Sequence, residues 1–273
     1  LIPIDSVENI ESQIEPQPFS HADYQVDFAN FHEHLVNGEF SKLVLSRSVD
    51  IKRKPGLTAI SLFAEACRRY PRVMVALVST PQAGTWLTAT PEILLSGSGR
   101  FWQTMALAGT MPYSDKVRWS DKNIQEQRYV ATYVTEVLEH YTSDFTEHGP
   151  RTARAAHLAH LRSDFHFTLS NTDRVGELIQ ALHPTPAVCG LPKDEARQFI
   201  LANEHHDRRY YSGFMGPLSL HDTTHLYVTL RCMQLFNSHC RLYAGGGILP
   251  ESSEQLEWQE TEAKLDTMRR LFQ

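Results

Sequence analysis

The strand-like segments of this sequence gather in groups, and this grouping is the strongest constraint on the fold. Apolar, β-branched stretches lie at 42–52, 72–80, 85–97, 100–110, 210–220, 225–236 and 240–248. Such stretches between turn residues are typical of strands. Because strands follow strands in runs, the sequence favours an α+β fold over a doubly wound sheet. The turns between the last three stretches suit an antiparallel meander.

Helical patterns fill most of the remaining chain. Apolar residues with helical spacing predict helices at 21–38, 58–70, 123–141, 172–183 and 193–204. Ser252 and Gln255 have the spacing of a capping box and predict the start of a final helix. The stretch 144–168 gives no clear pattern. Residues 1–20 are polar, with three prolines, so we expect a linker or poorly ordered lead-in to one domain over 21–273.

Composition narrows the class of protein. The 273 residues are 41% hydrophobic and carry a net charge of -6, which is typical of a soluble protein and disfavours a nucleic-acid surface. No apolar run approaches the roughly 20 residues that span a bilayer, and no signal peptide is visible. Four cysteines without a CxxC pair fit reduced thiols in the cytoplasm. The first residue is not Met, so we expect the natural protein to begin upstream.

Three charged residues near the C-terminus share one helical face. Glu257, Glu260 and Lys264 follow the triple glycine 245–247 at offsets of three and four residues. From this stretch alone, a solvent-exposed ion-pair face is the commoner interpretation. The alternative is a magnesium site beside a lysine that binds an anion.

Other charged residues stand in apolar surroundings. Lys42 opens a strand, where a lysine at a strand edge commonly extends its amine to solvent. Glu92 follows Pro91 inside a strand-like stretch, where a turn carboxylate is the simpler reading. Arg231 interrupts "YVTLRCMQL", and a buried arginine needs an anion, so it is the best sign of a carboxylate or phosphate ligand. Glu126 lies four residues after Lys122, which could simply be its helical partner.

Several common motifs are missing. His157 and His160 lack an evident third ligand, and catalytic zinc needs three. The segment "AGGGI" fits neither a Walker A loop nor GxGxxG, and no GxSxG supports a serine hydrolase.

Taken together, nine stretches resemble the chorismate-utilising enzymes, and within them the isochorismate synthases. In order they are "KLVLSRSVDI", "TWLTATPEILLSG", "LAGT", "DKNIQEQ", "LHPTPAVCGLP", "DRRYYSGFMG", "VTLRCMQL", "LYAGGGILPESS" and "EWQETEAKL". The resemblance implies two packed, largely antiparallel β-sheets flanked by helices. Members of this family usually carry additional N-terminal strands, which this chain is expected to lack.

The resemblance also implies a site and a cofactor. It assigns Glu126, Glu257 and Glu260 to Mg²⁺, a hard cation that prefers carboxylate oxygens. The residues expected to bind substrate are Gly109, Thr110, His183, Tyr211, Arg231, Gly245 and Lys264. Lys42 is expected to be the base and Glu92 the acid. The family commonly has Glu-His at the helical metal site, whereas this chain has Glu126 and Gln127.

Within the family, three positions favour one reaction. Lys42 stands where ammonia-using members typically have glutamine, Ala108 stands where aminodeoxychorismate synthases carry a nucleophilic lysine, and salicylate synthases tend to have threonine near Ala187. The expected reaction is conversion of chorismate to isochorismate, feeding menaquinone or a catechol siderophore. A salicylate synthase and a non-catalytic chorismate-binding module are the alternatives. We expect a cytoplasmic monomer that needs no glutaminase subunit, membrane or nucleic acid.

Overall fold

The computed structural model describes residues 16, 19–114, 116–155, 157–219 and 222–273. Its α-helices are α1 (His21–Val36), α2 (Ala59–Arg69), α3 (Asp121–Glu139), α4 (Val175–Leu182), α5 (Lys193–Asn203) and α6 (Glu254–Arg269). Most of the predicted lead-in 1–20 lies outside the described residues. No helix within the described ranges is both long enough and apolar enough to cross a membrane.

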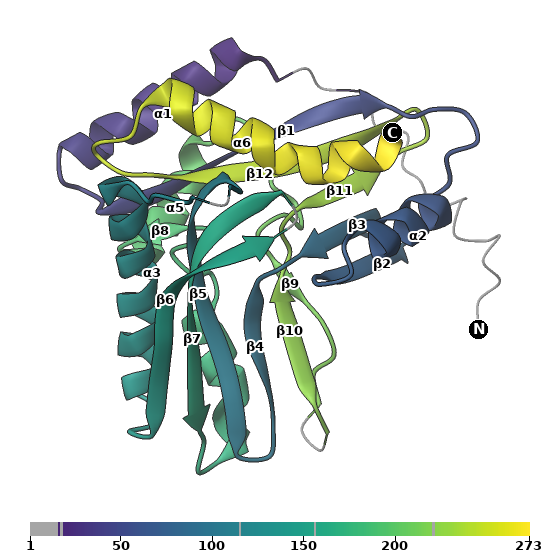
Figure 1. The fold of residues 1–273 in the computed structure, drawn as a ribbon. Coiled ribbons are helices and arrows are strands. Elements are labelled where there is room, and N and C mark those ends of the chain that lie inside the picture. Colours follow the sequence, from purple (N-terminus) through teal and green to yellow (C-terminus); the bar gives the residue numbers. More distant parts are fainter. Residues whose placement is uncertain (1–15, 17–18, 115, 156, 220–221) are drawn as a thin grey trace.

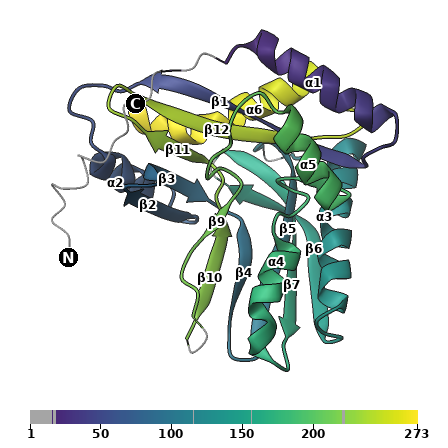
Figure 2. The ribbon, with the colours of Figure 1, turned by 180° about the vertical axis from the view of Figure 1, so that it is seen from behind.

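The strands form two six-stranded sheets (Figures 1 and 2). The first sheet has the order β2 (Met74–Thr80), β3 (Gly84–Thr90), β11 (Cys232–Leu235), β12 (His239–Ile248), β1 (Lys42–Lys52) and β8 (Gly190–Leu191). The second has the order β6 (Phe145–Ala155), β7 (Leu158–Thr168), β5 (Phe101–Pro112), β4 (Ile93–Ser98), β10 (Thr224–Val228) and β9 (Phe214–Met215). Every pairing between these strands is antiparallel. The predicted α+β fold with two antiparallel sheets flanked by helices is confirmed.

Separate apolar layers hold the helices on the sheets. α3 and α4 pack on the second sheet through residues that include Val130, Val134 and Leu178. α2 and the end of α6 cover one part of the first sheet, and α1 and α5 cover another. Burial of these side chains is the main favourable term for such layers, so each helix is fixed by its own apolar face.

Two predicted strands are each divided between the sheets. The antiparallel meander predicted for the last three strand-like stretches is therefore wrong. The stretch 85–97 forms β3 in one sheet and β4 in the other, and 225–236 does the same as β10 and β11. The breaks lie at Pro91–Glu92 and at 229–231, where Arg231 has a φ of 47°. An apolar stretch that leaves one sheet for another keeps its alternating pattern, so the sequence does not reveal the break.

Two further expectations need correction. The stretch 144–168, which gave no clear pattern, is the hairpin of β6 and β7. The final helix begins without the predicted capping box, because its N-cap is Ser253 and no side chain caps it. Instead, the Ser252 hydroxyl accepts from the Leu249 N–H at 3.0 Å and donates to the Glu257 carboxylate at 2.7 Å.

Candidate active site

The two breaks between the sheets lie side by side and bring Glu92 and Arg231 together. The Val228 N–H donates to the Glu92 carbonyl at 3.0 Å, and the Ala89 N–H donates to the Arg231 carbonyl at 3.0 Å. The two breaks are therefore joined to each other by backbone hydrogen bonds. A carboxyl and a guanidinium that are far apart in the sequence thus face the same space between the sheets.

β1 and β12 supply the opposite wall. Ser46, Leu45 and Val44 pair with the three glycines of β12 in order. A methyl group at Gly247 would overlap the Glu126 carboxylate and lie 2.8 Å from Cε of Lys42, and one at Gly245 would lie 2.8 Å from the Tyr211 hydroxyl. The triple glycine is thus required by the close approach of side chains to the strand, rather than by a tight turn.

Arg47 fixes α6 against this wall. Its side chain is fully buried, donates to the Thr261 hydroxyl at 2.7 Å and pairs with Glu262. Its guanidinium also lies 3.6 Å from the centre of the Trp258 ring, a stacking geometry that arginine favours. This contact sets which residues of α6 face the triple glycine.

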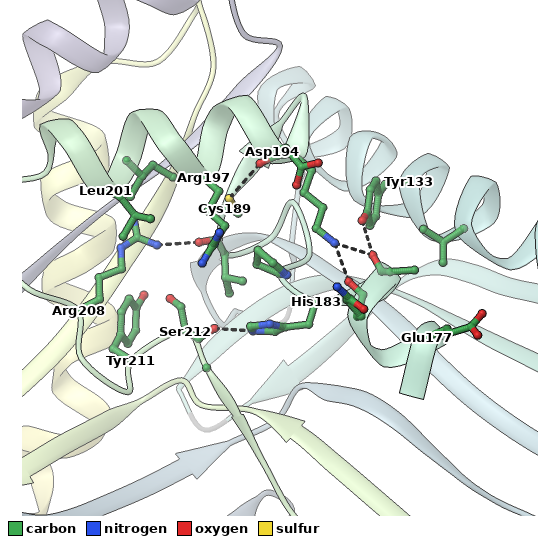
Figure 3. Close-up of a pocket in the computed structure, with 18 of the residues that line it drawn as sticks. Tyr133, Glu177, His183, Cys189, Asp194, Arg197, Leu201, Arg208, Tyr211 and Ser212 are labelled. Atoms are coloured by element: carbon green, nitrogen blue, oxygen red, sulfur yellow. Dashed lines mark hydrogen bonds between the residues drawn. The ribbon is translucent and has the colours of Figure 1, made fainter. Parts of the chain in front are cut away.

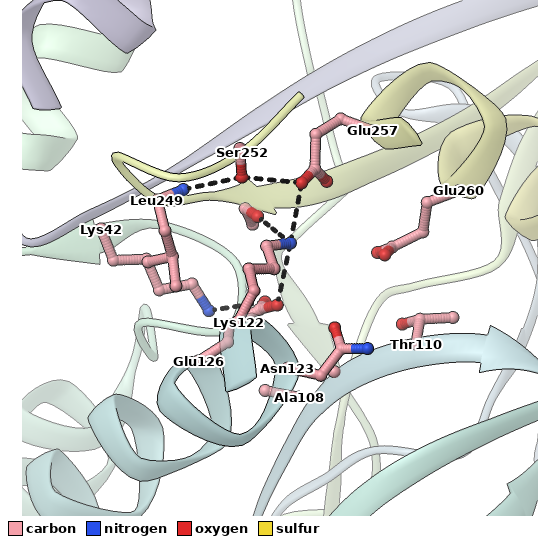
Figure 4. Close-up of polar contacts among 12 residues, drawn as sticks. Lys42, Ala108, Thr110, Lys122, Asn123, Glu126, Leu249, Ser252, Glu257 and Glu260 are labelled. Carbon is pink, nitrogen blue, oxygen red and sulfur yellow. Dashed lines mark hydrogen bonds and ion pairs between the residues drawn. The ribbon is translucent and has the colours of Figure 1, made fainter. Parts of the chain in front are cut away.

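Carboxylates and lysines alternate around the triple glycine (Figure 4). Lys42 Nζ lies 3.0 Å from Glu126 Oε1, and Lys264 Nζ lies 2.7 Å from Glu260 Oε1 and 2.8 Å from the Gly245 carbonyl. Lys122 Nζ lies 2.8 Å from Glu257 Oε1. The surface ion-pair reading of α6 is therefore wrong, because Glu257 is buried and Glu260 and Lys264 are largely so.

Burial and neighbouring charges set the protonation of these groups. Burial raises the pKa of Glu92 to about 7, although Lys42, Lys264 and Arg231 oppose the shift. Burial likewise raises the pKa of Glu257 to about 7, against the pull of Lys122. For Glu126, burial is outweighed by Lys42, Lys122 and Lys264, which hold its pKa at about 2. Burial also lowers the pKa of Lys42, against the opposing effect of Glu126.

One cavity joins most of the expected substrate-binding residues. Its lining includes Glu92, Gly109, Thr110, Glu126, Tyr211, Arg231, Gly245 and Lys264. Lys42 is fully buried behind Glu126. The expected substrate-binding residues thus converge on one cavity between the sheets, with one exception, whereas Glu257 and Glu260 line an adjoining pocket.

His183 is that exception. It lines a separate pocket of about 980 Å³ between α4, α5 and the segment around Tyr211 (Figure 3). Its Nε2 lies 2.9 Å from the Ser212 carbonyl, and burial lowers its pKa. Tyr211 lines both the pocket and the cavity. His183 is therefore placed beside Tyr211, and the structure does not bring it to the cavity that holds Glu92 and Arg231.

Arg231 is buried without a carboxylate partner among the described residues. It is 7% exposed, and its guanidinium contacts the Thr267 hydroxyl at 3.3 Å and His160 Nε2 at 3.0 Å. Burial lowers its pKa. A buried guanidinium whose protein partners are both neutral is suited to bind an anion from the cavity.

His160 is a site residue that sequence reasoning missed. Its Nδ1 lies 3.1 Å from the Gly109 carbonyl. Burial lowers the pKa of His160 well below its usual range, and the positive charge of the nearby Arg231 adds to this effect. The neutral ring therefore donates from Nδ1 to this carbonyl and accepts at Nε2 from Arg231. Recognising β7 in 144–168 would have placed His160 opposite Thr110, because these two residues are register partners.

Gln127, which stands where the family has histidine, faces away from the carboxylates. Its amide oxygen accepts from the Ala108 N–H at 2.9 Å, and its amide nitrogen donates to the Ala106 carbonyl at 3.1 Å. The side chain thus satisfies backbone groups of β5 beside Gly109. Gln127 holds α3 on β5, so the substitution leaves the position of Glu126 supported.

The carboxylates have the donor chemistry of a magnesium site. Their oxygens are hard ligands, and Glu257 Oε2 is buried without a hydrogen-bond partner among the residues that the structure describes. The three side chains flank Gly246 and Gly247, which leave room for them. As they stand, no three histidine, cysteine or acidic side chains in the described ranges lie close enough to hold a metal ion. The carboxylates are the type of ligand that Mg²⁺ prefers, but in this structure Glu126 and Glu257 lie on either side of the Lys122 ammonium.

Comparisons with known proteins show which proteins this chain is similar to. Isochorismate synthase EntC of Escherichia coli is 30% identical over 245 residues, which cover 86% of this chain and 63% of that protein. A crystal structure of DhbC from Bacillus anthracis has a TM-score of 0.87 at 31% identity, covering 93% of this chain and 72% of that one. The structure of MenF, the menaquinone-specific isochorismate synthase of E. coli, has a TM-score of 0.84 at 28% identity, covering 96% of this chain and 66% of that one.

The chain therefore spans less than two thirds of the length of EntC and MenF. The sequence model of the family described as "Chorismate binding enzyme" matches residues 5–273. Because this match takes in nearly the whole chain and the cavity lies inside it, the protein belongs to the family of chorismate binding enzymes.

Proposed function

We propose that this protein converts chorismate to isochorismate. The observation that carries the proposal is the cavity in which Arg231, buried without a carboxylate partner in the described part of the chain, faces Glu92 near Lys42. Chorismate is a dianion, so a protein with a net charge of -6 must supply local positive groups to bind it. Arg231 and Lys264 supply them, beside the backbone of Gly109 and Gly245.

The proposed reaction adds water at C2 and removes the hydroxyl at C4. Lys42 takes a proton from the attacking water, and burial, which lowers its pKa, favours the neutral amine that a base requires. Glu92 gives a proton to the departing hydroxyl, which leaves as water. Its pKa of about 7 keeps much of this carboxyl protonated near neutral pH. One water enters and one leaves, so the conversion is an isomerisation.

Each remaining site residue has a place in this proposal. Arg231, with Tyr211 and the backbone at Gly245, binds the enolpyruvyl carboxylate. Gly109 and Thr110 lie beside the ring carboxylate. His160 orients Arg231 through the 3.0 Å contact to its Nε2. His183 holds the segment that follows Tyr211 through its 2.9 Å contact with the Ser212 carbonyl.

We also propose that Glu126, Glu257 and Glu260 hold Mg²⁺. When bound, the ion would neutralise a substrate carboxylate, which these glutamates alone would repel. The buried Glu257 Oε2, which has no hydrogen-bond partner in the described ranges, supports this assignment. Because Lys42 occupies the position that is typically glutamine in ammonia-using members, we propose that the protein works without a glutaminase subunit. Its four free cysteines support a cytoplasmic location, and we propose that it is a monomer.

Product analysis tests the proposal. Incubation with chorismate and Mg²⁺ should yield isochorismate by NMR, and EDTA should abolish the reaction. Accumulation of salicylate with pyruvate would instead identify a salicylate synthase. Binding of chorismate by calorimetry without any product would identify a non-catalytic binding module.

A further inference from the structure

The ammonium of Lys122 lies between two of the carboxylates (Figure 4). Its Nζ is 2.8 Å from Glu257 Oε1, 3.4 Å from Glu126 Oε2 and 2.7 Å from the Gly247 carbonyl. These contacts join α3, α6 and β12. An ammonium has three hydrogen-bond donors, and each of the three is used here. Lys122 thus contacts α6 and β12 in addition to Glu126, the helical partner that the sequence indicated.

This ammonium occupies the space that the carboxylates would share around a metal ion. Glu126 and Glu257 each direct one oxygen at Lys122. Glu126 is also bound by Lys42, and Glu260 by Lys264. Mg²⁺ at this place would need oxygens within about 2.0–2.1 Å of itself, so it and the Lys122 ammonium cannot share the position.

The neighbouring surface offers Lys122 another position. A pocket of about 410 Å³ opens beside the starts of α3 and α6, and Lys122, Glu257 and Glu260 line it together with Ser120 and Glu251. Lysine carries its charge on a flexible four-carbon stem. Rotation of that stem would move the ammonium from the carboxylates into the pocket without moving either helix.

We propose that Lys122 is the built-in counter-ion of this carboxylate cluster, and that a divalent cation binds by displacing its ammonium into the pocket beside α3. The inference rests on the proposed magnesium site, and it is independent of the reaction. Lys122 thereby sets the metal affinity of the cluster and keeps its buried carboxylates paired until an ion arrives. Its tests use metal alone, so that failure of the proposed reaction would leave the result interpretable.

The first test follows the amine in the wild-type protein. Lys122 is 16% exposed and fully hydrogen-bonded, so a short pulse of an amine-acetylating reagent should label it slowly. Saturating Mg²⁺ should raise its labelling several-fold, as read by mass spectrometry of the peptide. Labelling of exposed Lys52 is the control and should not change. If labelling of Lys122 is unchanged or reduced when Mg²⁺ is bound, the ion does not displace the ammonium and the proposal is wrong.

The second test measures metal affinity directly. Lys122→Met removes the competing charge, so Mn²⁺ should bind at least about tenfold more tightly than to wild type, the factor that corresponds to about 1.4 kcal/mol. Lys122→Arg retains the charge and should not show this gain. Lys52→Met, which changes the net charge equally at an exposed position, should match wild type. Mn²⁺ titrations in which Lys122→Met binds no more tightly than Lys52→Met would contradict the proposal.

Discussion

Burial controls the chemistry of individual residues in this cavity. Lys42 is fully buried and Glu92 nearly so, and burial is the largest cause of both pKa shifts. Desolvation disfavours the charged form of each group. It therefore drives the lysine toward a neutral base and the glutamate toward a neutral acid, the two states that addition and removal of water require.

Replacement of Arg231 tests anion binding. Arg231→Ala should weaken transition-state binding by roughly 2–5 kcal/mol, because the substrate carboxylate loses its buried partner. Arg231→Lys should restore only part of this binding free energy, since an ammonium lacks the planar, two-pronged geometry of the guanidinium. Steady-state kinetics measure both. An unchanged kcat/KM in Arg231→Ala would show that Arg231 serves only to hold His160 and Thr267.

Replacement of Lys42 tests the base. Lys42→Gln should lower kcat about 10²–10⁴-fold, the usual scale of general acid–base catalysis, with a smaller change in KM because the carboxylate contacts remain. The same variant should gain slow amination at high ammonia, since it matches the glutamine of ammonia-using members. Isochorismate formation at the wild-type rate would remove Lys42 from the mechanism.

The pH dependence of kcat tests the acid. Glu92 must be protonated to donate, and its pKa is about 7, so kcat at saturating Mg²⁺ should fall as pH rises above about 7. Saturating Mg²⁺ is needed because Glu257, whose pKa is also about 7, would otherwise add a pH dependence of metal binding to the measurement. A rate that stays level well above neutral pH would be inconsistent with Glu92 as the acid.

At the level of elements, the site depends on where strands leave one sheet for the other. The alternating pattern of 85–97 and 225–236 predicted strands, yet it could not predict that each divides between two sheets. The positive φ of Arg231, which marks one break, has no sequence signal because arginine rarely adopts it. β1 was predicted with its observed bounds, whereas the β6–β7 hairpin, and with it His160, was not.

The glycines of β12 permit a prediction about this wall. Gly247→Ala should destabilise the protein by about 1–3 kcal/mol, as overpacking commonly does, because the added methyl overlaps the Glu126 carboxylate. Gly176→Ala in α4 is the control, since a methyl there meets nothing within 4 Å and alanine favours a helix. Urea unfolding compares them. Equal stabilities of the two variants would contradict the close approach.

In the whole molecule, the cavity exists because two sheets enclose it, and its charges come from the breaks between the sheets, from β1 and from helices on both sheets. Glu126 comes from α3 on the second sheet, while Lys42 and the residues of α6 belong to the first. The resemblance to a known family predicted most of the residues that meet here, but it wrongly included His183 and missed His160, and composition predicted none of them. The contact of Lys122 with Glu257 was unpredicted, because it joins residues that lie far apart in the sequence.

In the proposed reaction, this cavity adds water to C2 of chorismate as the C4 hydroxyl leaves. The most direct measurement is mass spectrometry of the product formed with Mg²⁺ in water labelled with oxygen-18. We expect isochorismate carrying one heavy oxygen, located by NMR at the C2 hydroxyl. Isochorismate without the label would mean that the hydroxyl migrates within the substrate, and unaltered chorismate would mean that the protein does not catalyse this reaction.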